Sequence, residues 1–327
     1  MTVLKLSLND IYAPIEEDLA QFGAVLKKEL ASEDELIKGI HNHLLKMSGK
    51  FLRPALSLLC ARLGRKTHPD AVRLAVAIEL IHTATLVHDD IIDNSELRRN
   101  QPSIFSKWGR EISIVSGDYL YAKAFLLLAN LKNLWVNEAF ALCAHVMCEG
   151  ELKQIEKRNN FLMSEAEYLK IIHQKTAALF QAASAGGAYF AGLDKPQIQA
   201  MSDYGYQLGM AFQIVDDILD LVGETESLGK TIGLDIYKND VTLPVLYLFQ
   251  SLSNEQKSSL LKEMQNGTPG LFQKIKTLAV ESKSIERAAE QAKKYIERAL
   301  SDLDGLKPSV YKESLANLAQ YCIERVR

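Results

Sequence analysis

Apolar residues with helical spacing run through most of this chain and leave little of it for any other secondary structure. Between scattered glycines and prolines they recur at intervals of three and four, as in the stretch 69–93. No convincing run of alternating β-branched residues interrupts the pattern, and only 8 of 327 residues are proline. The sequence therefore predicts an all-α protein. Because it contains no linker and no short-period repeat, we expect one domain over residues 1–327.

Composition and charge argue against several classes of protein. The chain is 47% apolar and 24% charged, which is typical of a globular protein with enough apolar residues for a core. A net charge of -3 provides no basic field, so we expect no nucleic-acid partner. The N-terminus lacks a signal-type apolar core, and the four cysteines form no CxxC pair. We therefore expect a cytoplasmic protein with reduced thiols.

One segment, 176–193, has nearly the length of a membrane span. It is rich in alanine, glycine and serine, contains Gln181, and has few large aliphatic residues. We expect it to form a buried helix in close contact with its neighbours, and we expect no membrane span.

Two clusters of aspartates stand out, because carboxylates this close together raise one another's pKa and resist burial. The sequence LVHDDIIDNSELRRNQP, residues 86–102, places three aspartates at the end of an apolar helical stretch: Asp89, Asp90 and Asp93. The sequence FQIVDDILDLVG repeats the pattern with Asp216, Asp217 and Asp220.

The spacing of both clusters indicates bound cations. The first and last aspartates of each cluster are four residues apart, so their carboxylates share one face of a helix. The partial negative charge of a helix C-terminus increases the repulsion between them. Magnesium fits best, since it takes one or two protein carboxylates and completes its shell with water and phosphate oxygens. No Cys/His set has the spacing of a zinc site.

Basic residues accompany both clusters. Arg98 and Arg99 follow the first cluster and Lys230 follows the second, while other basic residues lie in GKFLRP (Lys50, Arg53) and HQKTA (Lys175). Arginine matches phosphate oxygens in bidentate geometry, and lysine adds a point charge. Each residue alone could be an ordinary surface charge. Together with two aspartate clusters, they indicate two diphosphate sites, one bridged through magnesium and one held directly by cations.

From GKFLRP to the TLP at 242–244, the chain resembles the trans-type polyprenyl (isoprenyl) diphosphate synthases. ELIHTATLVHDDIID and VMCEGELKQI make it most similar to the long-chain bacterial heptaprenyl and octaprenyl enzymes. The resemblance implies a bundle of roughly a dozen helices around a deep apolar cavity, usually as a homodimer. It implies head-to-tail condensation of isopentenyl diphosphate onto an allylic diphosphate, with about three Mg²⁺ per active site when substrate is bound. It leaves open whether a small second subunit is needed.

The resemblance also implies roles for individual residues. The principal magnesium ligands would be Asp89, Asp93 and Asp216, with Asp90, Asp217 and Asp220 in support. Isopentenyl diphosphate would be held by Lys50, Arg53, His82 and Arg99. The allylic diphosphate would be held by Arg98, Lys175 and Lys230, and the reacting centre would be lined by Thr176 and Gln213.

The sequence departs from the family pattern at two places. Many relatives have Gly-Lys before TLP, where this chain has Asn239 and Asp240. A carboxylate beside a diphosphate is unexpected there, and we expect Lys238 to compensate it. Asn100 stands where relatives commonly have glycine after the paired arginines.

Product length is predicted from helix geometry. Thr85 and Ala84 lie four and five residues before Asp89, and Ile81 lies one turn deeper, so a growing hydrocarbon must pass these side chains. Relatives that make short products place aromatic rings here. The small residues therefore favour a long all-trans product of about C35–C40. The alternative is that Ala84 is small because another helix packs against it.

Other functions remain open. The chain could be a shorter-chain synthase of the geranylgeranyl type, or the catalytic large subunit of a heteromeric heptaprenyl diphosphate synthase. Class I terpene cyclases also ionise allylic diphosphates, but they normally carry one aspartate-rich motif. A regulatory partner subunit would be expected to lose aspartates, whereas all six are present here.

Overall fold

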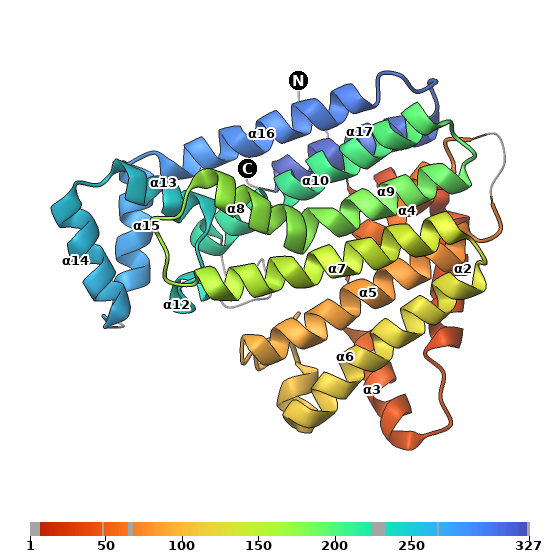
Figure 1. The fold of residues 1–327 in the computed structure, drawn as a ribbon, viewed down its shortest axis with the longest axis horizontal. Coiled ribbons are helices and arrows are strands. Elements are labelled where there is room, and N and C mark those ends of the chain that lie inside the picture. Colours follow the sequence, from red (N-terminus) through yellow and green to blue (C-terminus); the bar gives the residue numbers. More distant parts are fainter. Residues whose placement is uncertain (1–6, 48, 65–67, 224–232, 267, 326–327) are drawn as a thin grey trace. The chain divides into compact units, whose positions relative to one another are not determined.

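The computed structural model describes residues 7–47, 49–64, 68–223, 233–266 and 268–325, and almost all regular structure in this part of the chain is helical (Figure 1). The prediction of an all-α protein is confirmed. The chain forms two compact units. Unit 1 comprises residues 1–144, 179–205 and 300–321, and unit 2 comprises residues 145–178, 206–299 and 322–327. The expectation of a single domain stays a prediction.

Unit 1 is built from the N-terminal half of the chain and two later segments. Its own elements are α1 (Leu8–Tyr12), the 3-10 helix η1 (Ala13–Ile15), α2 (Glu16–Glu29), α3 (Glu35–Lys46), α4 (Leu52–Ala61), α5 (Ala71–Ile92), β1 (Leu97–Arg98), β2 (Gln101–Pro102), α6 (Ile104–Asn130) and nearly all of α9 (Ala178–Phe190). Apart from α9, whose first residue lies in unit 2, the described helices that contribute residues to both units are α7 (Leu134–Lys157), α10 (Lys195–Val222), α16 (Ser284–Asp302) and α17 (Val310–Glu324).

Helix α5 is the core of unit 1. Most of its apolar side chains are buried, from Leu74 and Ile78 to Val87 and Ile91, and α6 runs beside it (Figure 1). Each fully buried Leu or Ile contributes roughly 1.5–3 kcal/mol, so this helix is well fixed. The rigid helix therefore holds the aspartate cluster at its C-terminal end.

Among the described residues, two helices, α5 and α6, are long and apolar enough to cross a membrane by length and composition alone. In α5, 67% of the apolar window is buried, whereas in α6 only 39% is. Most of the segment 176–193 forms α9 (Ala178–Phe190), a helix whose side chains are mostly buried. The prediction of a buried helix in this segment is confirmed.

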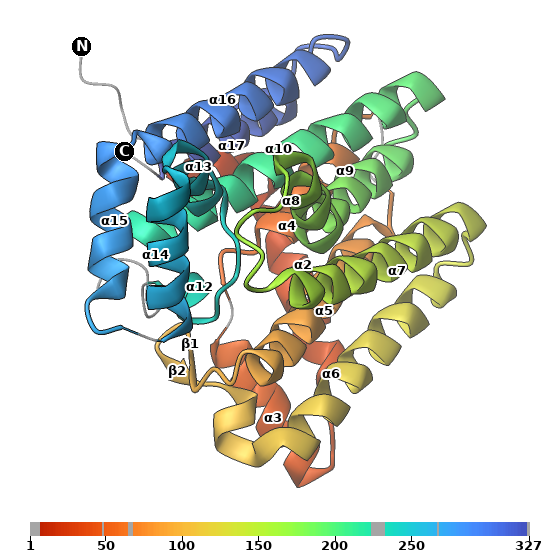
Figure 2. The same ribbon diagram turned by 60° about the vertical axis from the view of Figure 1, so that its left-hand side comes forward.

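A tight hairpin follows α5. Strands β1 and β2 pair antiparallel, Arg98 with Gln101, and the two turn residues Arg99 and Asn100 both have positive φ, 51° and 58° (Figure 2). Positive φ at both central positions is the conformation of a type I′ turn, which matches the twist of the flanking strands. Asparagine tolerates this conformation, so Asn100 is suited to this turn position.

Unit 2 contains the remaining helices. Its own elements are α8 (Glu165–Ile172), the π-helical turn η2 (His173–Ala177), α12 (Leu234–Tyr237), α13 (Leu243–Ser251), α14 (Asn254–Gln265) and α15 (Leu271–Glu281). The last four surround an apolar core that includes Val245, Leu248, Phe249 and Ile275, and Phe161 stacks on Phe249 from the loop before α8.

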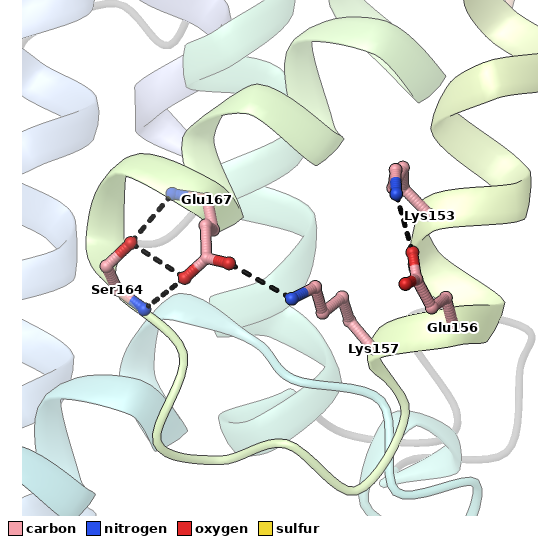
Figure 3. A network of polar contacts seen from close by, with 5 residues as sticks. All are labelled: Lys153, Glu156, Lys157, Ser164 and Glu167. Carbon is pink, nitrogen blue, oxygen red and sulfur yellow. Dashed lines mark hydrogen bonds and ion pairs between the residues drawn. The ribbon is translucent and has the colours of Figure 1, made fainter.

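The start of α8 is fixed by a capping box. The Ser164 hydroxyl accepts from the Glu167 N–H at 3.2 Å, and the Glu167 carboxylate accepts from the Ser164 N–H at 3.0 Å (Figure 3). Lys157, at the end of α7, donates to the same carboxylate at 3.0 Å. These bonds lower the pKa of Glu167 to about 2, first through the Ser164 N–H and then through Lys157. The direction in which α8 leaves the loop is therefore set by three residues.

Candidate active site

The first aspartate cluster lies at the end of α5. The helix continues through it, because the Asp93 N–H donates to the Asp89 carbonyl at 2.8 Å, so Asp89 and Asp93 share a face and both are half-buried. Asp90 points elsewhere: it is 2% exposed, and its Oδ1 accepts from Nε and Nη2 of Arg98, each at 2.7 Å. The structure thus brings Asp90 and Arg98 into contact with each other.

Arg53 and His82 form a second group in unit 1. Arg53 Nη1 lies 3.3 Å from His82 Nε2, and the guanidinium carbon lies 4.4 Å from the centre of the Phe180 ring. Arginine has only donors, so His82 Nε2 accepts and the ring proton is on Nδ1. Burial holds the pKa of His82 well below its usual value, and the charges of Arg53, Arg99 and Arg98 lower it further. His82 is therefore neutral at neutral pH, and the arginines carry the positive charge.

The hairpin turn places Arg99 against the segment before α4. Its Nη1 donates to the Met47 carbonyl at 2.7 Å, and a Cβ at Gly49 would collide with its guanidinium group. Glu79, a residue that the sequence did not single out, is buried in α5. Burial raises the pKa of Glu79 to about 7, and the positive charges of Arg53 and Arg99 oppose the rise. Glu79 thus provides a counter-charge for two of the predicted diphosphate-binding arginines.

Lys50 is held by both ends of the chain. Its Nζ donates to the Tyr321 hydroxyl at 3.2 Å and lies 5.7 Å from the centre of that ring. The Tyr12 hydroxyl donates to the Lys50 carbonyl at 3.0 Å. Residues 38 positions earlier and 271 positions later therefore position a lysine that is predicted to bind isopentenyl diphosphate.

The second aspartate cluster lies near the end of α10, in unit 2, and repeats the arrangement of the first. Asp216 and Asp220 share a face and are half-buried. Asp216 Oδ1 accepts from Arg325 Nη2 at 2.7 Å, and Asp220 Oδ2 accepts from the Asp235 N–H at 3.3 Å. The Arg325 guanidinium also lies over the Phe212 ring, 4.9 Å from its centre. A residue from the end of the chain therefore neutralises the first aspartate of this cluster.

The middle aspartate of this cluster is again buried and held by protein groups. Asp217 is 4% exposed. Its Oδ2 accepts from the Tyr168 hydroxyl at 2.6 Å and from the Leu243 N–H at 3.4 Å, and its Oδ1 accepts from Gln213 Nε2 at 2.8 Å. Burial raises the pKa of Asp217 to about 7, although these three hydrogen bonds oppose the rise. Burial also raises the pKa of Tyr168, and the neighbouring Asp217 raises it further.

The predicted residues Lys175 and Thr176 lie on the π-helical turn η2. Thr176 Oγ1 donates to Gln213 Oε1 at 2.6 Å, so the two residues predicted to line the reacting centre are in contact. Lys175 Nζ pairs with Glu151 at 2.6 Å. Glu151 follows Gly150 in α7. A Cβ at residue 150 would lie only 2.6 Å from the backbone nitrogen of Lys175. The turn is thus pressed against α7, and π-helical turns of this kind often occur at functional sites.

Asp240 has a partner that the sequence did not suggest. Arg158 Nε donates to Asp240 Oδ1 at 2.9 Å, and Asp240 is buried. The Asn159 N–H donates to the Asn239 carbonyl at 2.9 Å, which joins the same two loops. Arg158 therefore supplies a compensating cation for Asp240, and the compensation expected of Lys238 stays a prediction. Lys230 lies outside the described residues.

The residues predicted to control product length lie on the face of α5 that leads to Asp89. Ala84 and Ile81 are fully buried, and Thr85 is half-buried and donates to the His82 carbonyl at 2.7 Å. A cavity of about 40 Å³ lies along the opposite face of the same helix. On α5 it is lined by Glu79, Leu80, Thr83, Leu86, Val87 and Asp90.

The oxygen donors of both clusters fit a magnesium ion that arrives with a diphosphate. Across the described part of the chain, no three His, Cys, Asp or Glu side chains are grouped as a preformed metal site. Mg²⁺ does not need such a group, since it takes one or two carboxylates and keeps water and phosphate oxygens in its shell. Asp89 with Asp93, and Asp216 with Asp220, each supply one carboxylate pair.

The residues near the predicted site that sequence reasoning missed include Glu79, Tyr168, Arg158 and Arg325. Glu79 carries a signal in the sequence, because it is a single carboxylate within an otherwise apolar helical stretch. The other three have ordinary local surroundings, and only their long-range contacts distinguish them.

Comparison with known proteins decides the family. The polyprenyl synthetase profile matches residues 34–279, well over half of the chain. The chain belongs to this family. The family consists of prenyltransferase enzymes, so the resemblance inferred from the two aspartate clusters is confirmed.

Three similar proteins illustrate the match over the full length. Heptaprenyl diphosphate synthase component 2 of Geobacillus stearothermophilus is 36% identical, over 98% of this chain and 99% of that protein. The all-trans-nonaprenyl-diphosphate synthase (geranyl-diphosphate specific) of Rhodobacter capsulatus is 33% identical, over 97% of this chain and 98% of that protein. The crystal structure of polyprenyl synthase from Caulobacter crescentus CB15, complexed with calcium and isoprenyl diphosphate, has a TM-score of 0.93 and 34% identity and covers 99% of each chain.

Proposed function

We propose that this chain condenses isopentenyl diphosphate head-to-tail onto an allylic diphosphate and makes a long all-trans polyprenyl diphosphate of about C35–C40. The observation that carries the proposal is one arrangement repeated at two helix ends. In each, an outer pair of half-buried carboxylates flanks a buried aspartate that is held by protein groups. The long-chain synthases among the relatives support the same reaction class.

The reaction requires charge stabilisation at a leaving group. The bond from the allylic carbon to the diphosphate oxygen breaks, and its electron pair goes to the diphosphate. Cations positioned in advance stabilise that charge, and we assign this role to Arg98, Lys175 and Lys230. The alkene of isopentenyl diphosphate then forms the new carbon–carbon bond, and the proton that is lost goes to the departed diphosphate. Apolar surroundings protect the cationic carbon from water.

Mg²⁺ would supply Lewis-acid neutralisation of the leaving diphosphate. Asp89, Asp93 and Asp216 would hold it, with Asp220 in support and about three ions per site when substrate is bound. The Caulobacter relative was crystallised with calcium and isoprenyl diphosphate, which supports the binding of a divalent cation together with a diphosphate. The support that Asp90 and Asp217 are expected to give the metal stays a prediction, and their oxygens also accept from protein donors.

Isopentenyl diphosphate would bind at the cationic group of unit 1. The positive charge of this group comes from Lys50, Arg53 and Arg99, and His82 is neutral beside them. This diphosphate stays attached during the reaction, so the group serves in binding rather than in stabilising a leaving charge. Product length would be set on α5, where Ala84, Thr85 and Ile81 carry no aromatic ring.

We also propose a cytoplasmic homodimer, whose apolar product then partitions into membranes. Apolar side chains on α6 and the first half of α7 are exposed in unit 1: Ile114, Val115, Tyr119, Leu126, Leu134 and Leu142. Three residues separate the two helices, and such short connections make helices antiparallel neighbours. Because so little of the long apolar helix α6 is buried, its exposed face is suited to packing against a second copy of the chain.

Turnover of labelled isopentenyl diphosphate by the purified chain tests the proposal. The chain is incubated with several allylic primers and Mg²⁺, and the products are sized. We expect long polyprenyl products, loss of turnover with EDTA, and recovery with added Mg²⁺. Asp89→Ala should lower kcat by at least about 10³-fold while the helical content is kept, because a metal-borne electrostatic effect is lost.

Each alternative predicts a different outcome of the same assay. A terpene cyclase would release hydrocarbon from the allylic primer and leave isopentenyl diphosphate unused. A chain that depends on a second subunit would be inactive alone. Near wild-type turnover in Asp89→Ala would contradict the proposed mechanism.

A further inference from the structure

A continuous chain of hydrogen bonds joins the predicted reacting centre to the second aspartate cluster. Thr176 donates to Gln213 at 2.6 Å, Gln213 donates to Asp217 at 2.8 Å, and Tyr168 donates to Asp217 from the other side at 2.6 Å. All four residues lie in unit 2. Three of them are buried, and Gln213 is half-buried.

Three separate elements fix the members of this chain. The capping box in Figure 3 ends at Glu167, so it places the next residue of α8, Tyr168. Gln213 and Asp217 are four residues apart on α10 and therefore share a face. Thr176 lies on the π-helical turn η2, whose neighbouring Gln174 donates to Glu149 of α7 at 3.0 Å. Helices α8 and α10 and the turn η2 therefore fix the positions of all four hydrogen-bonded residues.

Every bond in the chain has one possible direction. Asp217 receives three donors, from Tyr168, Gln213 and the Leu243 N–H, and in its ionised form it is the acceptor in all three bonds. The Gln213 amide must then turn its NH₂ group to Asp217 and its oxygen to Thr176. The Thr176 hydroxyl proton is therefore committed to Gln213, and the lone pairs of Thr176 Oγ1 are left for other partners.

We propose that Asp217 and Tyr168 are positioning residues that fix the direction of the Gln213–Thr176 hydrogen bond and so present oxygen lone pairs to the reacting carbon. This rests on the proposed function, in which an allylic carbon gains positive charge, and on the role that the family resemblance implies for Thr176 at the reacting centre. An oxygen lone pair stabilises such a charge, whereas a hydroxyl proton pointing at it would oppose the reaction. Asp217 then serves the reaction through Gln213 and Thr176 rather than as a metal ligand.

An isosteric substitution can reverse the donor–acceptor direction of these hydrogen bonds. In Asp217→Asn the carbonyl oxygen stays with its donors Tyr168 and Leu243, so the new NH₂ group faces Gln213. The Gln213 amide must flip, and its NH₂ group then donates to Thr176. A second substitution, Gln213→Glu, again gives the Thr176 hydroxyl an acceptor at residue 213. It also returns residues 213 and 217 together to their original total charge. The double variant Asp217→Asn/Gln213→Glu therefore recovers the original direction.

Steady-state kinetics test this reversal. We expect Asp217→Asn to lower kcat by roughly 10²-fold with KM for both substrates within about threefold, and the double variant to recover at least about tenfold. The Mg²⁺ concentration for half-maximal activity should be unchanged in both. Asp216→Asn is the matched control, because a proposed metal ligand one residue away should raise that concentration. Tyr168→Phe should lower kcat less than Asp217→Asn does, since one donor to Asp217 remains beside Gln213.

Two results would overturn the proposal. A rise in the Mg²⁺ requirement of Asp217→Asn that matches Asp216→Asn would make Asp217 a metal ligand. A double variant no better than Asp217→Asn would exclude control through hydrogen-bond direction. Loss of fold is checked by circular dichroism and thermal unfolding.

A readout without turnover separates this inference from the proposed function. In protein labelled with ¹⁵N-glutamine, one side-chain amide proton of Gln213 should be shifted downfield and slow to exchange. Asp217→Asn should remove that shift. An inactive wild-type chain would contradict the proposed function alone, whereas a Gln213 amide that exchanges like an exposed glutamine would contradict the hydrogen-bond chain.

Discussion

Adjacent aspartates in the two clusters have different surroundings because successive residues of a helix point about 100° apart. In each aspartate cluster, the outer aspartates are half-buried and the middle one is buried. The buried carboxylates are stabilised by Arg98 in one case and by Tyr168 and Gln213 in the other. The same motif therefore contains two kinds of position, half-buried outer carboxylates and a buried middle carboxylate.

Gly49 shows how a residue without a side chain can serve a binding site. The Arg99 guanidinium occupies the space that a Cβ at residue 49 would need. Arg99 itself has φ 51°, a conformation that is uncommon for residues other than glycine and that tends to occur at functional sites. The turn and the glycine together determine where this arginine lies.

Gly49→Ala should displace Arg99 without unfolding the protein, because the colliding group is the far end of a flexible side chain. We expect KM for isopentenyl diphosphate to rise roughly tenfold, or about 1.4 kcal/mol, with kcat within about twofold. Initial rates at varied isopentenyl diphosphate concentration measure this. Gly39→Ala is the control, since a Cβ there meets nothing within 4 Å. Equal KM values for both variants would contradict the role of Gly49.

The entry to α8 shows how the start of a helix can position a buried residue. The capping box and Lys157 converge on the Glu167 carboxylate, and Tyr168 follows it. A nearby pair, Lys153 with Glu156 at 2.7 Å, lies on one helix and bonds to no backbone group of the loop (Figure 3). Exposed pairs of this second kind stabilise proteins little.

Glu167→Gln should reduce stability more at neutral pH than at low pH. The pKa of Glu167 falls from its ordinary 4.5 to about 2 on folding, so its contribution is present above about 4.5 and is lost as pH falls towards 2. We expect a lower urea midpoint than wild type at pH 7 and a smaller difference at pH 3. Glu156→Gln is the control and should change the midpoint less. Equal changes of the urea midpoint in both variants would show that the Glu167 contacts stabilise the protein no more than the exposed Lys153–Glu156 pair does.

At the scale of the whole molecule, the exposed apolar face of α6 is the feature that a single chain does not explain. Val115, Tyr119 and Leu126 share one side of this helix and are all exposed. Monomeric proteins rarely leave contiguous apolar surface open to water. The proposed homodimer would cover this face.

Leu126→Glu should therefore yield a monomer. A carboxylate buried in an apolar interface without a partner costs about 3–5 kcal/mol, which lowers dimer affinity by more than about 100-fold. Analytical ultracentrifugation should show the mass of one chain, 36.5 kDa, in place of twice that mass. Val280→Glu, at an exposed apolar position on α15, should leave the mass unchanged. A wild-type chain that sediments as a monomer would contradict the dimer.

Local pattern alone was enough to predict the fold class, the two aspartate clusters and the buried helix α9. Helical periodicity and i, i+4 spacing depend only on residues within a few turns of one another. The closeness of Thr176 and Gln213 came from the family resemblance, and the contact between them is observed.

The partners of the site residues were decided only by tertiary structure. Tyr168 lies 49 residues from Asp217, Arg158 lies 82 residues from Asp240, and Arg325 lies 109 residues from Asp216. Such contacts depend on how helices distant in sequence come together, and nothing in the local sequence encodes that arrangement. The sequence could show which carboxylates are grouped, but which of them are open to a ligand depends on burial and on donors contributed by distant parts of the chain.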